Sequence, residues 1–186
     1  PRTGGVTQGR LIAVVGPSGV GKDSVMAGIH RAMPDMRLVR RVITRSPDLG
    51  DEDYDAVTVP VFKKLAREGA FAVHWSAHGL FYGVPAEVHN RLAEGEDCLV
   101  NFSRKALSKA ASIFPHLIIL NITASPETLA HRLAARGREA EADIARRLAQ
   151  ADKPLPDGLN IINLSNDGPL EEAIAQAAAL LQPESA

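Results

Sequence analysis

The stretch "RLIAVVGPSGVGKDSVMAG", which begins at Arg10, constrains the fold more than any other part of the chain. Residues 10–15 form a short apolar run typical of a buried strand, and residues 22–33 have helical spacing up to Pro34. The loop between them, "GPSGVGK", matches the pattern GxxxxGK. Between a strand and a helix, this pattern turns backbone N–H groups and the helix N-terminus toward a bound phosphate. We therefore expect a nucleotide triphosphate site at this turn.

The residues of this phosphate loop have separate expected roles. Gly16, Gly19 and Gly21 let the backbone wrap around the anion, and Lys22 would reach the β- and γ-phosphates. The alternative is a glycine-rich turn with a chance lysine, which the strand, the spacing and the helix together disfavour. The residues predicted to bind nucleotide here are Gly16, Pro17, Ser18, Gly19, Val20, Gly21, Lys22, Asp23 and Ser24.

Asp23 is the unusual residue of the loop, because a Ser or Thr is expected after the lysine and gives its hydroxyl to Mg²⁺. A partner carboxylate commonly comes from a later strand, but here that strand ends in "VNFS", with Asn101 and Ser103. Since Mg²⁺ prefers oxygen ligands and keeps several waters, we predict that Asp23 serves the metal, directly or through water. The alternative is that Asp23 caps the helix and faces away from the nucleotide.

Composition limits what the rest of the chain can do. With 186 residues and 45% hydrophobic content, the chain is large enough for one domain with its own core. A formal net charge of -1 disfavours binding to nucleic acid or to a membrane by bulk electrostatics. No apolar run approaches the roughly 20 residues that span a bilayer. The composition does not set the oligomeric state.

The single cysteine and the start of the chain complete this picture. Cys98 lies in the apolar run "DCLVNF" and has no partner for an internal disulfide, so we expect a buried thiol and a cytoplasmic location. We expect residues 1–9 to be a flexible lead-in and residues 10–186 to form a single domain.

Strand-like and helical segments alternate along the chain. The spacing predicts strands at residues 10–15, 37–43, 97–102, 116–122 and 159–164, and helices at residues 22–33, 104–113, 126–136, 141–152 and 169–181. Residues 57–95 mix shorter pieces, with a helix at 59–69 and a strand at 71–75. The alternation predicts an α/β fold in which a five-stranded parallel sheet is flanked by helices.

Arginine clusters distinguish among the classes of protein that use a phosphate loop. A small kinase needs the loop, a clamp for the acceptor phosphate and a lid that carries arginines, and arginine suits both because it grips phosphate with two parallel hydrogen bonds. The stretch "RRVITR" supplies a candidate clamp with Arg40, Arg41 and Arg45. Around Gly137, a candidate lid contains Arg132, Arg136, Arg138, Arg146 and Arg147. We expect an acceptor-binding subregion at about 43–92 and a lid at about 134–146 in a P-loop kinase.

Four separated stretches, "GPSGVGK", "TRSPDLGDEDYDAV", "HGLFYG" and "RLAARGREAEADIARRL", resemble the guanylate kinase family in order and spacing over residues 10–181. The resemblance implies that Arg45, Tyr54 and Tyr82 bind the acceptor phosphate. It also implies that Arg136 and Arg147 are catalytic lid arginines, beside Lys22 and Asp23. ATP and Mg²⁺ are the implied co-substrate and metal. Asn166 in "NLSND" is implied as a contact of the adenine base.

The chain also departs from the guanylate kinase pattern. The acidic residue that reads guanine falls at Val73, a guanine-site serine falls at Arg41, and a second clamp arginine falls near Asp48. Valine cannot accept a hydrogen bond from a base, so these positions favour an acceptor that is a polyanion. We predict substrate contacts for Arg41 and for His78, which lies beside Gly79.

A group within the superfamily resembles this chain in the same positions. The stretches "GPSGVGKDS", "RVITR", "HWSAHGLFYG" and "VNFSR" are similar to the ribose 1,5-bisphosphate phosphokinases of bacterial phosphonate breakdown. This resemblance implies transfer of a phosphoryl group from ATP to the 1-phosphate of ribose 1,5-bisphosphate, which gives 5-phosphoribosyl 1-diphosphate. The expected partner is therefore a small phosphorylated sugar. A nucleoside monophosphate kinase that acts on GMP stays open, as does a noncatalytic binding module, although such modules are expected to lose the loop lysine.

Two conspicuous residue types have structural explanations. His74 and His78 are four residues apart, but on a strand that spacing separates them by about 13 Å, too far to share a metal ion. Trp75 is expected in the core rather than as a platform for a base, since no second aromatic residue is paired with it in sequence.

Overall fold

A computed structural model describes residues 8–17, 19–46, 54–135, 145, 146, 148 and 155–182 of the chain. The chain forms two compact units. One unit comprises Pro1–Ala13 with Asp35–Ile118, and the other comprises Val14–Pro34 with Ile119–Ala186. Among the described residues, no helix is both long and apolar enough to cross a bilayer.

The main sheet has five parallel strands in the order β2-β7-β1-β8-β9, as the sequence predicts. Strand β1 is completely buried: every residue from Leu11 to Val15 is apolar and has no exposed surface. Parallel strands covered by helices on both faces read as such uninterrupted apolar runs. The strands are β1 (Leu11–Val15), β2 (Arg37–Leu38), β7 (Cys98–Asn101), β8 (Leu117–Thr123) and β9 (Ile161–Ser165).

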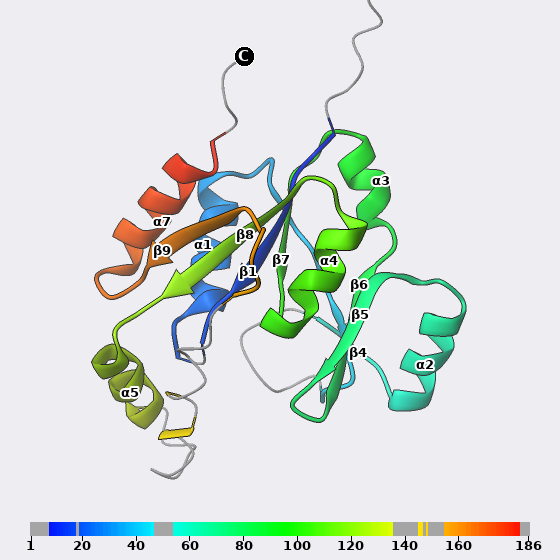
Figure 1. The fold of residues 1–186 in the computed structure, drawn as a ribbon, viewed down its shortest axis with the longest axis horizontal. Coiled ribbons are helices and arrows are strands. Elements are labelled where there is room, and N and C mark those ends of the chain that lie inside the picture. The colour runs from blue at the N-terminus through cyan, green and yellow to red at the C-terminus, as the bar shows by residue number, and fades with distance from the viewer. Residues whose placement is uncertain are drawn as a thin grey trace, which may run out of the picture. The chain divides into compact units, whose positions relative to one another are not determined.

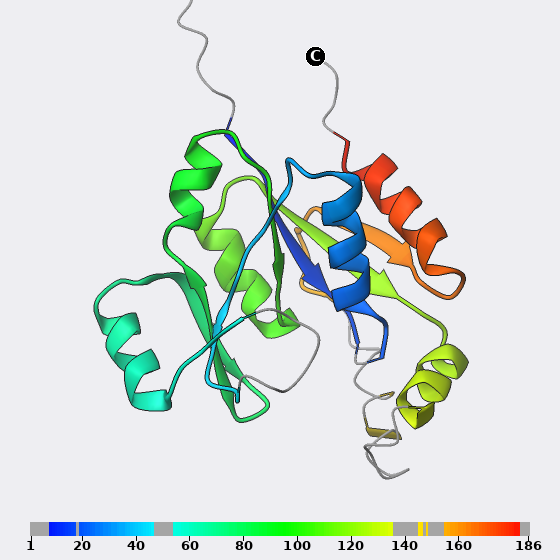
Figure 2. The same ribbon diagram turned by 180° about the vertical axis from the view of Figure 1, so that it is seen from behind.

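Helices α1 (Lys22–Ala32), α5 (Pro126–Ala135) and α7 (Leu170–Leu180) belong to the unit that contains the phosphate loop. Figures 1 and 2 show α7 beside α1 and β9. The approach of α7 to α1 depends on Gly28, since a Cβ there would lie 2.1 Å from Cδ1 of Ile174. The helix expected at residues 141–152 falls largely outside the described residues, of which 145, 146 and 148 are helical.

A second sheet, of four strands in the order β4-β3-β6-β5, lies in the other unit. Strands β5 and β6 form an antiparallel hairpin whose turn contains His78 and Gly79. Helix α2 (Val59–Arg67) packs on this sheet through Phe62, whose ring stacks on Phe71 with centroids 4.7 Å apart. The strands are β3 (Val42–Ile43), β4 (Asp55–Ala56), β5 (Phe71–Ala77) and β6 (Leu80–Pro85).

The prediction of a single strand at residues 37–43 is wrong. Its first part, β2, pairs with β7 in the main sheet, whereas its last part, β3, pairs with β4 and β6 in the second sheet. Between them Arg40 turns outward, donating from Nε to Oδ1 of Asp55 at 2.6 Å. One apolar run therefore serves two sheets, which its spacing alone does not reveal.

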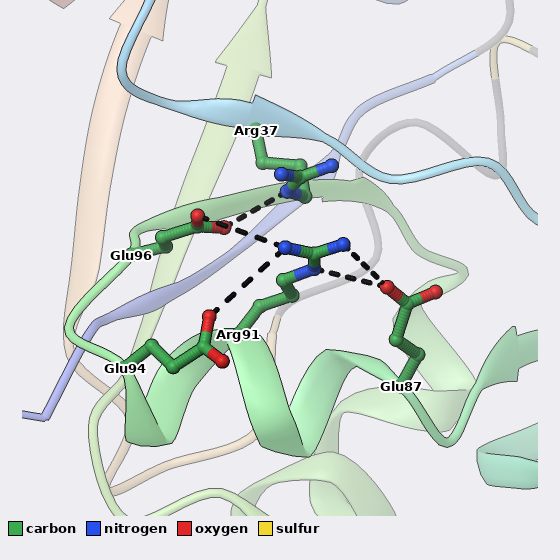
Figure 3. A network of polar contacts seen from close by, with 5 residues as sticks. All are labelled: Arg37, Glu87, Arg91, Glu94 and Glu96. Carbon is green, nitrogen blue, oxygen red and sulfur yellow. Dashed lines mark hydrogen bonds and ion pairs between the residues drawn. The ribbon is translucent and has the colours of Figure 1, made fainter.

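The unit of the second sheet also contains shorter helical pieces, which are α3 (Val88–Ala93), the 3-10 turn η1 (Arg104–Ala106) and α4 (Leu107–Ile113). An exposed ion-pair network joins α3 to the start of β2 (Figure 3). Arg91 bonds Glu87 at 2.7 Å and approaches Glu96 at 3.9 Å, and Glu96 accepts from Nε of Arg37 at 2.9 Å. The hydrogen bond from Arg37 lowers the pKa of Glu96, whereas burial raises the pKa of Cys98 to about 11. Cys98 is a buried free thiol, as predicted.

Candidate active site

The phosphate loop directly follows the carboxyl end of β1, the central strand of the main sheet. In open parallel sheets, ligands bind beyond the carboxyl ends of the strands. Gly19 and Gly21 have φ values of 86° and 88°, which side chains other than glycine rarely adopt. Val20 between them has no exposed surface and anchors the loop, and its N–H donates to the Pro17 carbonyl at 3.2 Å. Ser18 lies outside the described residues.

Two side chains from distant parts of the chain hold the loop by the carbonyl oxygen of Val20. Nδ2 of Asn166 donates to this oxygen at 2.8 Å, and a guanidinium nitrogen of Arg132 donates to it at 3.1 Å. Arg132 also donates to the backbone oxygen of Asn166 at 2.7 Å, so the three residues are joined to one another, and we call them the brace. The brace consists of Val20, Arg132 and Asn166, and sequence reasoning missed it.

The brace changes how Asn166 is understood. Its side chain is 4% exposed, and its Nδ2 already donates to the loop. Nδ2 also lies 3.0 Å from the position that a Cβ on Gly21 would occupy, so the amide lies directly against the loop. Its Oδ1 is buried and has no hydrogen-bond partner among the described residues. The predicted contact of Asn166 with a base stays a prediction, whereas its contact with the loop is part of the structure.

Lys22 and Asp23 occupy the first turn of α1. The N-cap residue is Gly21, in a left-handed conformation and without a side-chain cap, so Asp23 is not the N-cap residue. A carboxylate in the first turn interacts favourably with the positive end of the helix dipole. One carboxylate with phosphate oxygens and waters is a suitable ligand set for Mg²⁺. Within the described part of the chain, no three His, Cys, Asp or Glu side chains gather into a self-sufficient metal site.

The predicted acceptor residues gather in the unit of the second sheet. The guanidinium of Arg41 lies over the ring of Tyr82, 4.9 Å from its centroid, and that of Arg45 lies 5.7 Å from the centroid of Tyr54. Arg45 also donates to the hydroxyl of Tyr82 in a long hydrogen bond of 3.5 Å. The hydroxyl of Tyr54 donates to the carbonyl oxygen of Ser46. Four residues that sequence reasoning assigned to the acceptor, Arg41, Arg45, Tyr54 and Tyr82, therefore form one cluster.

The two arginines of this acceptor cluster differ in how exposed they are. Arg41 is 4% exposed, whereas Arg45 is half-buried and reaches the surface. The cluster thus contains one accessible guanidinium, that of Arg45, and one buried guanidinium, that of Arg41, which lies over the ring of Tyr82.

Two neighbouring positions were also assigned from the sequence. Val73 is 2% exposed on β5 and pairs with Val84, so a buried apolar side chain occupies the position at which an acidic residue would read guanine. His78 is exposed in the hairpin turn, with a φ of 53°. Because β5 ends at Ala77, His78 does not share a strand with His74, and the strand spacing used to separate the two histidines was the wrong argument. The predicted substrate contact of His78 stays a prediction.

The stretches "HWSAHGL" and "VNFSR" meet in space. Nε1 of Trp75 donates to Oγ of Ser103 at 2.9 Å, and its indole stacks on Phe102 with centroids 4.8 Å apart. On the other strand of the hairpin, Tyr82 also stacks on Trp75, at 5.7 Å. The expected core position of Trp75 is confirmed, and its two aromatic partners, Tyr82 and Phe102, come from other segments of the chain.

The arginines of the predicted lid are only partly described. Arg132 belongs to the brace, and Arg136 and Arg147 lie outside the described residues. At the end of β7, Asn101 is buried and Arg104 begins η1, so the strand end that usually carries an acid carries an amide here. The catalytic roles of Arg136 and Arg147 stay predictions.

Comparison with known proteins identifies relatives over nearly the whole chain. The family model described as "Guanylate kinase" matches residues 8–184. The ribose 1,5-bisphosphate phosphokinase PhnN of Ruegeria sp. (strain TM1040) is 47% identical over 180 residues, which cover 96% of this chain and 95% of the relative. The protein of the same name from Rhizobium etli (strain CIAT 652) is 43% identical, with 95% and 91% covered.

A solved structure supports the fold. The guanylate kinase from Anaplasma phagocytophilum superimposes with a TM-score of 0.64 at 20% sequence identity, covering 94% of this chain and 85% of that one. At this identity the likeness concerns the fold alone.

Proposed function

This chain belongs to the guanylate kinase family, and from that membership we propose that it transfers the γ-phosphoryl group of ATP to the 1-phosphate of ribose 1,5-bisphosphate. The products are 5-phosphoribosyl 1-diphosphate and ADP. The resemblance inferred from the sequence motifs is confirmed by the family model and by the curated relatives. The relatives named for this activity cover the chain almost from end to end, so the proposal concerns the whole of it.

The acceptor cluster is the observation that carries the proposal. Two arginines, Arg41 and Arg45, contact Tyr82, and the position of the guanine-reading acid is the buried Val73. A site for guanine needs hydrogen-bond acceptors for the base, whereas an acceptor with two phosphates needs cations. The cluster provides cations, and Val73 provides no acceptor.

The residues fit a reaction without a general base. The nucleophile is an oxygen of the acceptor phosphate, whose second pKa near ~6 leaves it largely ionised at neutral pH. This oxygen attacks the γ-phosphorus and forms a new P–O bond as the bond to the bridging oxygen of ADP breaks. Arg45 and the hydroxyl of Tyr82 would hold the attacking phosphate, and the hydroxyl of Tyr54 would join them by exchanging its bond to the Ser46 carbonyl for one to phosphate. The acceptor side then contributes positioning and charge neutralisation.

On the donor side, the loop N–H groups and Lys22 would bind the ATP phosphates. Asp23 is the residue that would hold Mg²⁺, which neutralises charge on the phosphates when bound. Arg136 and Arg147 would stabilise the transferring phosphoryl group from the lid. Use of ATP and a free, buried Cys98 both favour action in the cytoplasm. The proposed substrate, a small phosphorylated sugar, follows from the names of the relatives.

The test is an ADP-release assay with ribose 1,5-bisphosphate, GMP, AMP and dGMP as acceptors. We expect kcat/KM for ribose 1,5-bisphosphate to exceed that for GMP by about 10⁴-fold, since buried polar groups left unpaired reject an analogue by factors of this size. A Lys22→Ala variant purified in parallel shows how much release comes from contaminants. Comparable turnover of GMP would contradict the proposal and assign the chain to nucleoside monophosphate kinases.

A further inference from the structure

In the unit of the second sheet, three aromatic rings and one guanidinium stack one upon another. The ring of Phe102 lies on Trp75 at 4.8 Å and 19°, and Trp75 lies on Tyr82 at 5.7 Å and 11°. The guanidinium of Arg41 lies over Tyr82 at 4.9 Å. We call Phe102, Trp75 and Tyr82 the aromatic column, with Arg41 at its end.

The strand order explains why the column forms. Strand β6 lies between β3 and β5, and Tyr82 on β6 is paired with Ile43 on one side and with Trp75 on the other. Paired residues share a face, and so do residues two apart on a strand. Arg41 directly precedes β3, the neighbour of β6 on the side away from β5, and its guanidinium lies over the ring of Tyr82. The ring of Tyr82 therefore contacts both the Arg41 guanidinium and the Trp75 indole.

A hydrogen bond fixes the middle of the column. Trp75 is 8% exposed, and its only polar atom, Nε1, donates to Oγ of Ser103 at 2.9 Å. A buried N–H that loses its partner is costly, so this bond sets the orientation of the indole within its plane. Phe102, the residue before Ser103, stacks on the same indole.

The column ends where the acceptor phosphate is expected. The hydroxyl of Tyr82 lies 3.5 Å from a guanidinium nitrogen of Arg45, and the face of Tyr82 carries Arg41. A stacked ring cannot turn without losing contact with both neighbours. The direction of this hydroxyl and the place of the buried cation both depend on Trp75.

We propose that Trp75 and Ser103 are positioning residues for the acceptor phosphate, which act through Tyr82 and Arg41 without touching the substrate. The identity of the acceptor rests on the function proposed above, but the positioning role does not. Ordinary core packing would use the same rings for stability alone. The two explanations differ in what they predict for the acceptor and for ATP separately.

The experiment compares four variants: Ser103→Ala, Trp75→Phe, the double variant and Ser103→Thr. Ser103→Ala and Trp75→Phe each remove one partner of the hydrogen bond, and Ser103→Thr keeps the hydroxyl. We expect Ser103→Ala to raise KM for ribose 1,5-bisphosphate about fivefold, with KM for ATP unchanged, in line with the loss of one positioning hydrogen bond. The double variant should be no worse than Trp75→Phe, because both changes break the same bond. Ser103→Thr should restore the acceptor KM.

The matched control is Ser112→Ala, which removes a serine hydroxyl that donates to the Lys109 carbonyl on the exposed side of α4. It should leave both KM values unchanged. Melting temperatures are measured for every variant, because Ser103→Ala leaves a buried N–H unpaired and lowers stability in either explanation.

Fluorescence gives a second readout in the unaltered protein. Trp75 is the only tryptophan of the chain, so tryptophan emission reports on the column alone. Adding ribose 1,5-bisphosphate without ATP should change the emission, and adding ADP alone should not. This arm remains decisive if a variant fails to fold.

Three results would overturn the proposal: equal rises of both KM values, an acceptor KM that stays unchanged in Ser103→Ala, or an emission that saturating acceptor does not alter. If ribose 1,5-bisphosphate proves not to be a substrate and GMP does, the proposed function fails. The same variants and titrations with GMP then still decide the role of the column.

Discussion

At the scale of single residues, the carboxylate at position 23 is the most consequential departure in the phosphate loop. The structure places Asp23 in the first turn of α1, after an N-cap residue that has no side-chain cap of its own. A free carboxylate near ATP would repel its phosphates, so a working loop requires a cation between them. This requirement makes Asp23 a ligand for Mg²⁺ in the proposed mechanism.

We expect Asp23→Asn to raise the Mg²⁺ concentration for half-maximal rate about tenfold or more, since the shape is kept and the charge is lost. The melting temperature should stay close to that of the unaltered protein. Asp35→Asn removes an exposed carboxylate just beyond α1 and should leave the Mg²⁺ dependence as it is. An unaltered Mg²⁺ dependence with a lowered melting temperature would show that Asp23 serves the helix instead.

At the scale of elements, the brace ties the phosphate loop to α5, through Arg132, and to the turn after β9, through Asn166. Both side chains donate to the carbonyl oxygen of Val20, so they fix the orientation of the peptide group that joins Val20 to Gly21. The N–H groups of the following residues are the ones expected to bind phosphate. An arrangement that positions these donors before ATP arrives lowers the cost of binding.

We expect Asn166→Ala to lower stability by about 0.5–1.5 kcal/mol, the usual net contribution of one hydrogen bond, because Arg132 still donates to the Val20 carbonyl, and to raise KM for ATP. The KM for the acceptor should not change, because the acceptor cluster shares no residue with the brace. Thermal unfolding and steady-state kinetics with each substrate varied provide the measurement. Asn160→Ala, an exposed amide just before β9, is the matched control. A rise in both KM values would argue against a role specific to the loop.

At the scale of the whole molecule, catalysis requires cations from segments far apart in sequence. The overall charge of -1 offers no general attraction for a substrate with two phosphates and a nucleotide with three. In the proposed mechanism local arginines supply the neutralisation: Arg41 and Arg45 for the acceptor, and Arg136 and Arg147 from the predicted lid.

We expect Arg136→Ala and Arg147→Ala each to lower kcat and kcat/KM together by about 10³-fold, as when an arginine acts mainly on the transition state. Single-turnover rates at saturating ATP and steady-state rates over a range of ATP concentrations provide the measurement. Arg138→Ala should have a much smaller effect. If the arginines bind ATP only in the ground state, KM for ATP will rise while kcat is kept.

Patterns within contiguous stretches of the sequence were sufficient to predict much of this fold. An apolar strand, a glycine-rich loop and a helix within residues 10–33 predicted the phosphate loop, and the alternation after residue 97 predicted the parallel sheet. The loop and the sheet are local in sequence or repeat at a helical or strand period, which residue types encode directly. The family resemblance, not the periodicity, implied the acceptor residues Arg45, Tyr54 and Tyr82, and a departure from that family added Arg41; the four form one cluster.

Only the tertiary structure showed how the arginines and the aromatic residues are held. The run at 37–43 divides between two sheets, because pairing partners, which the run does not contain, decide where each half goes. The bond from Trp75 to Ser103 spans 28 positions, and the bonds from Arg132 and Asn166 to Val20 span 112 and 146. Periodicity states which side of a strand or helix is buried, but it does not state which distant side chain meets it there.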